Sequence, residues 1–340
     1  MKGSTLRAGV VGVGSMGENH ARIYSCLPDV ELVGVCDVDY RRAALVAEKF
    51  GTVAFHDLEH LLDSGIDVVS IAVPASGHHE AVSKCARAGC HILLEKPLAA
   101  DLSQAEKIIL ESQLNGVRIM VGHVERFNPV VRVLKEILDV DEVISIDIVR
   151  VGPKPPRIKD VGVIKDMGIH DIDLLRYLTG KEIASLYSLV AGEGAKEDIC
   201  RDREDIGILA FRMENGILGQ LTVNWITPFK VRKIQIAGST DFIEGDLFHR
   251  KVRLYRKGRD GNTCLASEIP IVQEEPLETE IKIFLDCILD GREFPISLSD
   301  ALRALEIAEL CTNKPGELII CHSPAGSGGT FLRGGGERND

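Results

Sequence analysis

The chain has 340 residues, which favours two domains because single hydrophobic cores rarely grow much beyond ~250–300 residues. Its composition, 45% hydrophobic and 27% charged, is that of a globular protein, and its formal net charge of −11 excludes a general nucleic-acid-binding surface. No apolar stretch approaches the ~20 residues of a membrane-spanning helix. No separate apolar leader precedes the first predicted strand, so we expect a cytoplasmic protein without membrane contact.

The cysteines indicate neither a disulfide framework nor a metal site. There are nine, an odd number, and they are scattered along the chain without the spacings of zinc ligands. The sequence therefore predicts that most of the cysteines are small buried thiols in a reducing compartment, and that no metal is bound.

The first third of the chain alternates strands and helices. Short apolar strands are predicted at 6–11, 30–36, 68–73, 92–94 and 118–121, and amphipathic helices between them at 43–50, 79–88 and 103–113. This alternation predicts an α/β domain with a doubly wound parallel sheet.

After about Gly122 the pattern changes to strands joined by turns. Strands are predicted at 208–213 and 217–225 around Asn215-Gly216, which is a strong hairpin signal. Further strands are predicted at 234–237, 242–244 and 252–255, and helices near 126–138, 164–178, 277–290 and 299–312. We expect an α+β domain with a large, mostly antiparallel open sheet. The Gly- and Ser-rich segment 323–340 is predicted to be a disordered tail.

A glycine-rich turn at residues 12–17 predicts a dinucleotide site. Gly12 permits the tight turn, Gly14 lets the backbone approach a pyrophosphate, and Gly17 lets the following helix pack closely on the strand. That helix is predicted at 15–26, so Ser15 and Met16 present free N–H groups at its positive end.

The acid that follows the second strand indicates which dinucleotide binds. Asp37 lies twenty residues after Gly17, where a carboxylate accepts both ribose hydroxyls and repels a 2′-phosphate. The sequence therefore favours NAD over NADP, although Arg41 and Arg42 nearby could soften the exclusion.

Two segments are predicted to border the nicotinamide. The loop from Pro74 to His78 follows the strand at 68–73, and ligands bind at the carboxyl ends of strands in such sheets. For His78, a packing or hydrogen-bonding role at a helix start stands beside direct contact. Glu95 and Lys96 close the strand at 92–94, where Lys96 is either a solvated side chain or a donor to a substrate hydroxyl.

A second constellation carries candidate acid–base chemistry. The spacing of four residues puts Asp166 and His170 on one helical face, and Asp173 follows three residues later. An imidazole titrates near neutrality and can take a hydroxyl proton as hydride leaves carbon. Asp166 could hold the imidazole or share the substrate. The alternative is an Asp/His pair on a helix surface.

Together these motifs resemble those of the glucose–fructose oxidoreductase/inositol dehydrogenase (Gfo/Idh/MocA) family. The matches are the glycine turn with Asp37, Pro74 to His78, Glu95-Lys96-Pro97, 126–129 and 166–173. The resemblance implies a Rossmann domain at 1–123, a substrate-binding and oligomerisation domain at 124–322, and a homodimer or homotetramer. It also implies NAD(P)-linked oxidation or reduction of a sugar or cyclitol hydroxyl, with Lys96, Asp166 and His170 as catalytic residues.

Within the family the chain is similar to archaeal UDP-N-acetylglucosamine 3-dehydrogenases, through segments 122–129, 153–157 and 225–230. This likeness implies oxidation at C3 of the nucleotide sugar. The predicted substrate contacts, besides Asp166 and His170, are Arg126, Asn128, Arg157, Trp225 and Lys230.

Two other functions remain open on the sequence: a free polyol or inositol 2-dehydrogenase, and an NAD-binding sensor without turnover. The cations of segments 154–159 and 230–233 could bind a substrate phosphate, or could form a solvated basic loop or a subunit contact.

Overall fold

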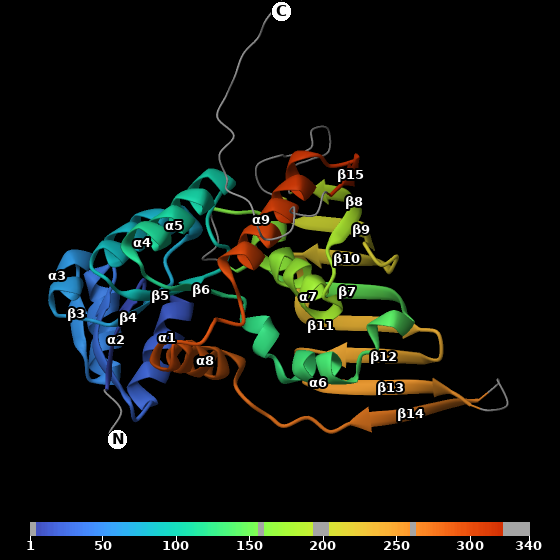
Figure 1. The fold of residues 1–340 in the computed structure, drawn as a ribbon, viewed down its shortest axis with the longest axis horizontal. Helices are drawn as coiled ribbons and strands as arrows, with labels where there is room; N and C mark the ends of the chain where they lie inside the picture. Colours follow the sequence, from blue (N-terminus) through green and yellow to red (C-terminus); the bar gives the residue numbers. More distant parts are fainter. Residues whose placement is uncertain (1–4, 156–159, 193–203, 259–262, 322–340) are drawn as a thin grey trace, which may run out of the picture.

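The computed structural model describes residues 5–155, 160–192, 204–258 and 263–321. They form two sheets that lie next to each other, a six-stranded parallel one and a nine-stranded mixed one (Figure 1). The predicted boundary between residues 123 and 124 falls between the last strand of the first sheet and the first turn that follows it. Arg157 and the predicted tail at 323–340 lie outside the described residues.

The first sheet confirms the predicted doubly wound parallel fold. Its order is β3-β2-β1-β4-β5-β6, and every pairing is parallel. The strands are β1 (Leu6–Val11), β2 (Val30–Cys36), β3 (Val53–Phe55), β4 (Val68–Ile71), β5 (His91–Glu95) and β6 (Ile119–Gly122). The connections contain α1 (Ser15–Cys26), α2 (Tyr40–Phe50), α3 (Leu58–Asp63), η1 (Ala75–Gly77), α4 (His78–Arg87) and α5 (Leu102–Asn115).

The second sheet confirms the predicted mostly antiparallel open architecture. Its order is β14-β13-β12-β11-β7-β10-β9-β8-β15, and among its pairings only β7 with β10 is parallel within the described chain. The strands are β7 (Val143–Pro153), β8 (Ile183–Ala191), β9 (Ile206–Met213), β10 (Leu218–Asn224), β11 (Ile226–Gly238), β12 (Asp241–Asp246), β13 (Lys251–Lys257), β14 (Cys264–Ile269) and β15 (Leu318–Ile320). The helical segments are η2 (Val124–Phe127), α6 (Pro129–Ile137), η3 (Val140–Glu142), the π-turn η4 (Ile164–Gly168), α7 (Ile169–Thr179), α8 (Pro276–Asp290) and α9 (Leu298–Asn313).

The predicted hairpin at Asn215-Gly216 is confirmed, whereas β7, the central strand of this sheet, was not predicted. Gly216 has φ 89° between β9 and β10, as the Asn215-Gly216 turn requires. Strand β7 was not among the predicted strands. Its inward side chains include Arg150, and its parallel partner β10 begins 65 positions beyond the end of β7, so no turn signal marks the pairing.

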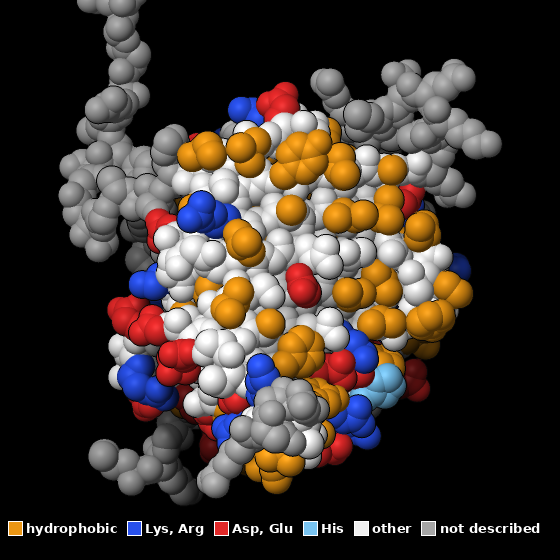
Figure 2. Space-filling view, turned by 90° about the vertical axis from the view of Figure 1, so that its right-hand side faces the viewer, with side chains coloured by type: hydrophobic (Ala, Val, Ile, Leu, Met, Phe, Trp, Pro, Cys, Tyr) orange, Lys and Arg blue, Asp and Glu red, His pale blue; other side chains and the backbone are white. Residues whose placement is uncertain are grey.

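One face of the second sheet is covered by helices, and the other is open among the described residues. Helices α6, α7 and α9 lie on the near face in Figure 1. On the other face Tyr187 pairs with Leu318 and Leu189 pairs with Ile208 across β15, β8 and β9, and all four are exposed. Figure 2, which views the molecule from the right-hand side of Figure 1, shows hydrophobic side chains spread over that side. No helix in the described ranges has both the length and the apolar character to cross a membrane.

Candidate active site

The glycine turn has the geometry that a dinucleotide requires. Gly12 has φ +81°, and a Cβ atom there would lie 2.8 Å from the backbone nitrogen of Val73. A Cβ atom at Gly17 would lie 1.8 Å from the carbonyl oxygen of Gly12, so α1 can pack on this turn only with glycine there. At Gly14 a Cβ atom would meet, among the described residues, only Nη1 of Arg42, at 3.9 Å. The backbone of Gly14 therefore faces open space, where a pyrophosphate can approach.

The first turn of α1 and Asp37 complete this half of the site. In the described part of the chain no side chain caps the N-terminus of α1, so its N–H groups are available to an anion. Asp37 is buried, and its Oδ2 and Oδ1 accept hydrogen bonds from the backbone nitrogens of Val13 and Asp39, both at 2.9 Å. These bonds fix the carboxylate beside the turn, as NAD binding requires, and Arg42 approaches it at 3.6 Å.

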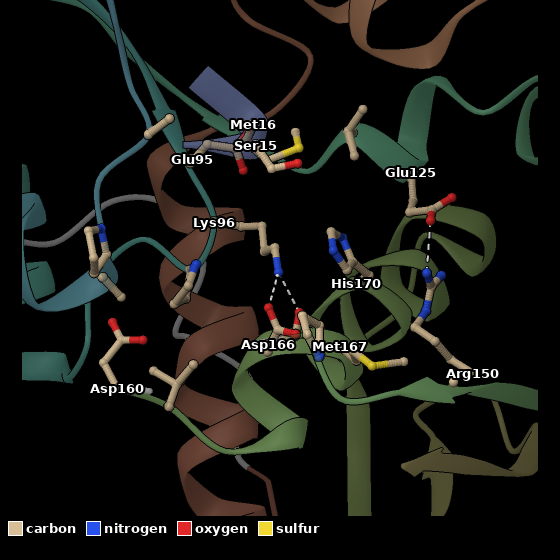
Figure 3. Close-up of a pocket in the computed structure, with 18 of the residues that line it drawn as sticks. Ser15, Met16, Glu95, Lys96, Glu125, Arg150, Asp160, Asp166, Met167 and His170 are labelled. Atoms are coloured by element: carbon tan, nitrogen blue, oxygen red, sulfur yellow. Dashed lines mark hydrogen bonds and ion pairs between the residues drawn. The ribbon is translucent and has the colours of Figure 1, made fainter. Parts of the chain in front are cut away.

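A cavity of about 430 Å³ lies between the carboxyl edge of the first sheet and the second domain (Figure 3). Its lining includes Ser15, Met16, Pro74, Glu95 and Lys96 from the first domain. The second domain contributes Glu125, Arg150, Asp160, Asp166, Met167, His170, Lys230 and Arg232. The structure thus brings together residues from the glycine turn, the Glu95-Lys96 motif and the Asp166–His170 motif.

Lys96 is held by Asp166, although 70 positions separate them. The Lys96 Nζ atom donates a hydrogen bond of 2.8 Å to Asp166 Oδ1 and another to the carbonyl oxygen of the same residue (Figure 3). Both side chains are largely buried. The ammonium group is therefore anchored by two of its three donors, and one remains.

His170 lies beside this pair and borders the same cavity (Figure 3). The segment before it is the π-turn η4, and His170 is the second residue of α7. Burial, with the charges of Lys96 and Arg150, holds the pKa of His170 well below 6.5. Nδ1 is buried with no hydrogen-bond partner among the described residues, which leaves Nε2 as the nitrogen that can meet a substrate. The imidazole is neutral at physiological pH and able to accept a proton.

Among the described residues, Asp166 is hydrogen-bonded to Lys96 and not to His170, which was one of the two partners expected from the sequence. Asp166 was expected either to hold His170 or to share the substrate, and in the structure its hydrogen-bond partner is Lys96. The sequence could not reveal this partner because Lys96 comes from the other domain.

A buried charge network that sequence reasoning missed forms the far wall of the cavity. Arg150 donates two hydrogen bonds to Asp171, of 2.7 and 2.8 Å, and a third of 2.8 Å to Glu125 Oε1. Arg232 lies directly opposite Arg150 on β11 and donates to the same Glu125 oxygen at 3.1 Å. Like charges opposite each other on a sheet repel, and Glu125 offsets this by accepting from both. The only local signal was an arginine within the short, otherwise apolar stretch 148–151.

Three of the predicted substrate contacts are buried and lie away from this cavity in the structure. Arg126 is buried and donates to both carboxylate oxygens of Asp173, at 2.7 and 2.6 Å. Asn128 caps α6 through the backbone nitrogen of Val130. Trp225 is buried, and none of the three borders the cavity. Their motifs match the family, but side-chain direction is decided by packing.

His78 has the packing and hydrogen-bonding role that the sequence left open beside direct contact. It is 1% exposed and does not border the cavity. Its ring nitrogens lie 3.3 Å from the carbonyl oxygen of Leu98 and 3.1 Å from that of Val73. Burial lowers its pKa. The ring therefore joins the start of α4 to the two loops around it.

Comparison with known families agrees with this geometry. Residues 6–123 match the family described as "Oxidoreductase family, NAD-binding Rossmann fold", and residues 143–244 match the "GFO/IDH/MocA C-terminal domain". The chain belongs to the Gfo/Idh/MocA oxidoreductase family. It is an oxidoreductase with NAD as cofactor, as the glycine turn and Asp37 predict.

Individual relatives act on sugars or cyclitols according to their names. A UDP-N-acetylglucosamine 3-dehydrogenase of Acidithiobacillus ferrooxidans is 29% identical over 291 residues, covering 84% of this chain and 90% of the relative. A solved structure of that enzyme superposes with a TM-score of 0.80 at 26% identity, covering 90% of this chain and 99% of the other. An inositol 2-dehydrogenase of Rubrobacter xylanophilus is 31% identical over 238 residues, covering 67% of this chain and 68% of the relative. The first relative is bacterial, whereas the sequence likeness was to archaeal enzymes.

Proposed function

We propose that this protein is an NAD-dependent dehydrogenase that oxidises a secondary hydroxyl of a sugar, with C3 of UDP-N-acetylglucosamine as the reacting carbon. The observation that carries the proposal is the position of Lys96 and His170. Both border one cavity, which Ser15 and Met16 of the dinucleotide turn also border. The hydroxyl oxygen, the proton acceptor and the nicotinamide side of the cofactor can therefore meet there.

Lys96 is assigned to hold the reacting hydroxyl. Two of its three N–H donors go to Asp166, so the third can donate to a substrate oxygen in the cavity. Donation to that oxygen stabilises the alkoxide character that develops as the hydroxyl loses its proton. Asp166 acts by orienting Lys96.

His170 is assigned to take the hydroxyl proton on Nε2. Its lowered pKa keeps the imidazole neutral, and a base must be unprotonated to act. Lys96 is the less suitable base because its ammonium group is paired with a carboxylate. NAD, when bound, accepts the hydride that leaves the carbon bearing this hydroxyl. The C–O single bond of that carbon becomes the C=O bond of a ketone.

The cations at the cavity favour an anionic group on the substrate. Lys230 is exposed, borders the cavity and has no acidic partner within 4 Å in the described ranges. Arg232 also borders the cavity and donates one N–H to Glu125. By contrast, Lys154 pairs with Asp205 and Lys233 with Glu244. We therefore assign the diphosphate of a nucleotide sugar to Lys230 and Arg232.

A second candidate is a free polyol or inositol 2-dehydrogenase. It is favoured by the inositol 2-dehydrogenase relative, which is 31% identical over 238 residues. In this case Lys230 would have no phosphate partner, and the charge network around Glu125 would face only hydroxyl groups.

The deciding experiment follows NADH absorbance with UDP-N-acetylglucosamine, free N-acetylglucosamine, UDP-glucose and myo-inositol at equal concentrations. We expect kcat/KM to be greatest for UDP-N-acetylglucosamine, with product analysis placing the ketone at C3. Equal kcat/KM for N-acetylglucosamine and its UDP form would reject the nucleotide requirement. A preference for myo-inositol would establish the second candidate.

We further propose that the open face of the second sheet joins copies of this chain into a homodimer or homotetramer. Tyr187, Leu189, Ile208 and Leu318 expose apolar surface on neighbouring strands, and such contiguous patches mark interfaces. Light scattering at micromolar concentration should give a molar mass of about two or four times the 37.1 kDa of one chain. Leu189→Glu should reduce the mass, and a monomeric unmodified protein would refute the proposal.

A further inference from the structure

A buried chain of hydrogen bonds runs beneath the Lys96 edge of the first sheet. The hydroxyl oxygen of Tyr24 lies 2.9 Å from Ser70 Oγ, and Ser70 Oγ lies 2.8 Å from His20 Nδ1. His20 Nε2 lies 3.1 Å from Glu95 Oε1. None of the four residues is more than 8% exposed.

An ionised Glu95 fixes the direction of the bond between His20 and Glu95. Burial by itself raises the pKa of Glu95, but the His20 hydrogen bond and the charge of Lys96 outweigh it, so the pKa is lowered. An ionised carboxylate only accepts, so His20 must donate from Nε2.

This chain connects the two parts of the site that must act together. His20 and Tyr24 lie on α1, the helix that begins at the dinucleotide turn. Glu95 ends β5, precedes Lys96 and borders the cavity. His20 is the side-chain donor to Glu95 among the described residues, and it binds Oε1, so Oε2 remains as an acceptor.

We propose that His20 is a positioning residue for the nicotinamide half of NAD. It holds the Glu95 carboxylate so that Oε2 accepts a hydrogen bond from the nicotinamide ribose or carboxamide, and it fixes the strand end that carries Lys96. This inference rests on the proposed placement of Glu95 and Lys96 beside the nicotinamide.

A purely structural role for His20 makes a different prediction about ligands. If His20 only stabilises the core, its loss affects the whole dinucleotide site or none of it. If it positions Glu95, its loss affects NAD but not ADP, because ADP lacks the nicotinamide and its ribose. Calorimetric titration with each nucleotide measures this difference and needs no substrate.

Two substitutions separate the two ends of the imidazole. His20→Asn places an amide where Nδ1 lies and retains the Ser70 contact, but it cannot reach Glu95. His20→Gln places an amide nitrogen where Nε2 lies and can still donate to Glu95. We expect His20→Asn to weaken NAD binding at least about tenfold, the effect of about 1.4 kcal/mol, with ADP unchanged. His20→Gln should retain NAD affinity to within roughly threefold, a loss of less than about 0.7 kcal/mol.

Ser83→Ala is the matched control, because Ser83 is a nearly buried donor to Glu111 in the same domain and does not border the cavity. It should leave both affinities unchanged. Equal weakening of NAD and ADP by His20→Asn, or wild-type NAD affinity in that variant, would overturn the proposal. If His20→Asn does not fold, Ser70→Ala decides: it removes the partner of Nδ1 and should weaken NAD selectively, and unchanged NAD affinity would reject the positioning role.

Discussion

Glu280 provides a quantitative test of how the two domains fit together. It lies in the first half of α8, a helix that contacts α1 and β5 of the first domain. The side chain is 0% exposed, and neither carboxylate oxygen has a hydrogen-bond partner among the described residues. Burial, with the nearby charge of Glu95, raises the pKa of Glu280 well above 4.5. The fold therefore favours the protonated form of this carboxyl group.

The raised pKa makes stability fall as pH rises. Below the unfolded-state pKa of about 4.5, both states bind the proton and Glu280 costs nothing by ionisation. Above it the unfolded chain releases the proton while the folded chain retains it. Each pH unit between the two pKa values then lowers the free energy of unfolding by about 1.4 kcal/mol. Glu280→Gln keeps the shape and removes this dependence.

The assay is urea unfolding of the wild type and Glu280→Gln at pH 5, 6 and 7, followed by circular dichroism. We expect the free energy of unfolding of the variant to rise relative to that of the wild type as pH rises, by up to about 1.4 kcal/mol per pH unit. The informative quantity is the slope of this difference against pH, because glutamine also lacks a hydrogen-bond partner at this position and so shifts stability equally at every pH. Glu278→Gln is the control, since Glu278 on the same helix is only half-buried and pairs with Lys282. Parallel stability curves for wild type and Glu280→Gln would refute a protonated, buried carboxyl group.

Three further predictions concern the site. Asp37→Ser should weaken NAD binding and narrow the gap between NAD and NADP in calorimetry, and tighter binding of NADP by the wild type would contradict the role of Asp37. His170→Ala and Lys96→Met should each lower kcat about 10²–10⁴-fold with NAD affinity retained. Because the pKa of His170 lies below 6.5, wild-type kcat/KM should fall only as pH drops below 6.5, and an acid limb above that pH would argue against His170 as the base. Lys230→Ala should raise KM for UDP-N-acetylglucosamine about tenfold or more with little change in kcat, whereas Lys233→Ala, which removes a cation paired with Glu244, should not.

Local sequence determined the parts of this protein that depend on neighbouring residues. Gly12, Gly14 and Gly17 predicted the turn and the bounds of α1, because backbone conformation and close packing there require glycine. The Asn215-Gly216 pair predicted a hairpin in the same way. Lys96 and His170 were identified as candidate catalytic residues from short motifs, and the structure places both at one cavity.

Tertiary structure decided which side chains meet. Asp166 binds Lys96 across 70 positions, His20 binds Glu95 across 75, and β7 pairs with β10 without a turn between them. Arg126 was expected at the substrate but is turned into a buried ion pair with Asp173. A spacing pattern records only the faces that one helix or strand presents. The partners on other elements depend on how the two sheets pack, which is set by the summed burial of the whole core and leaves no local signal.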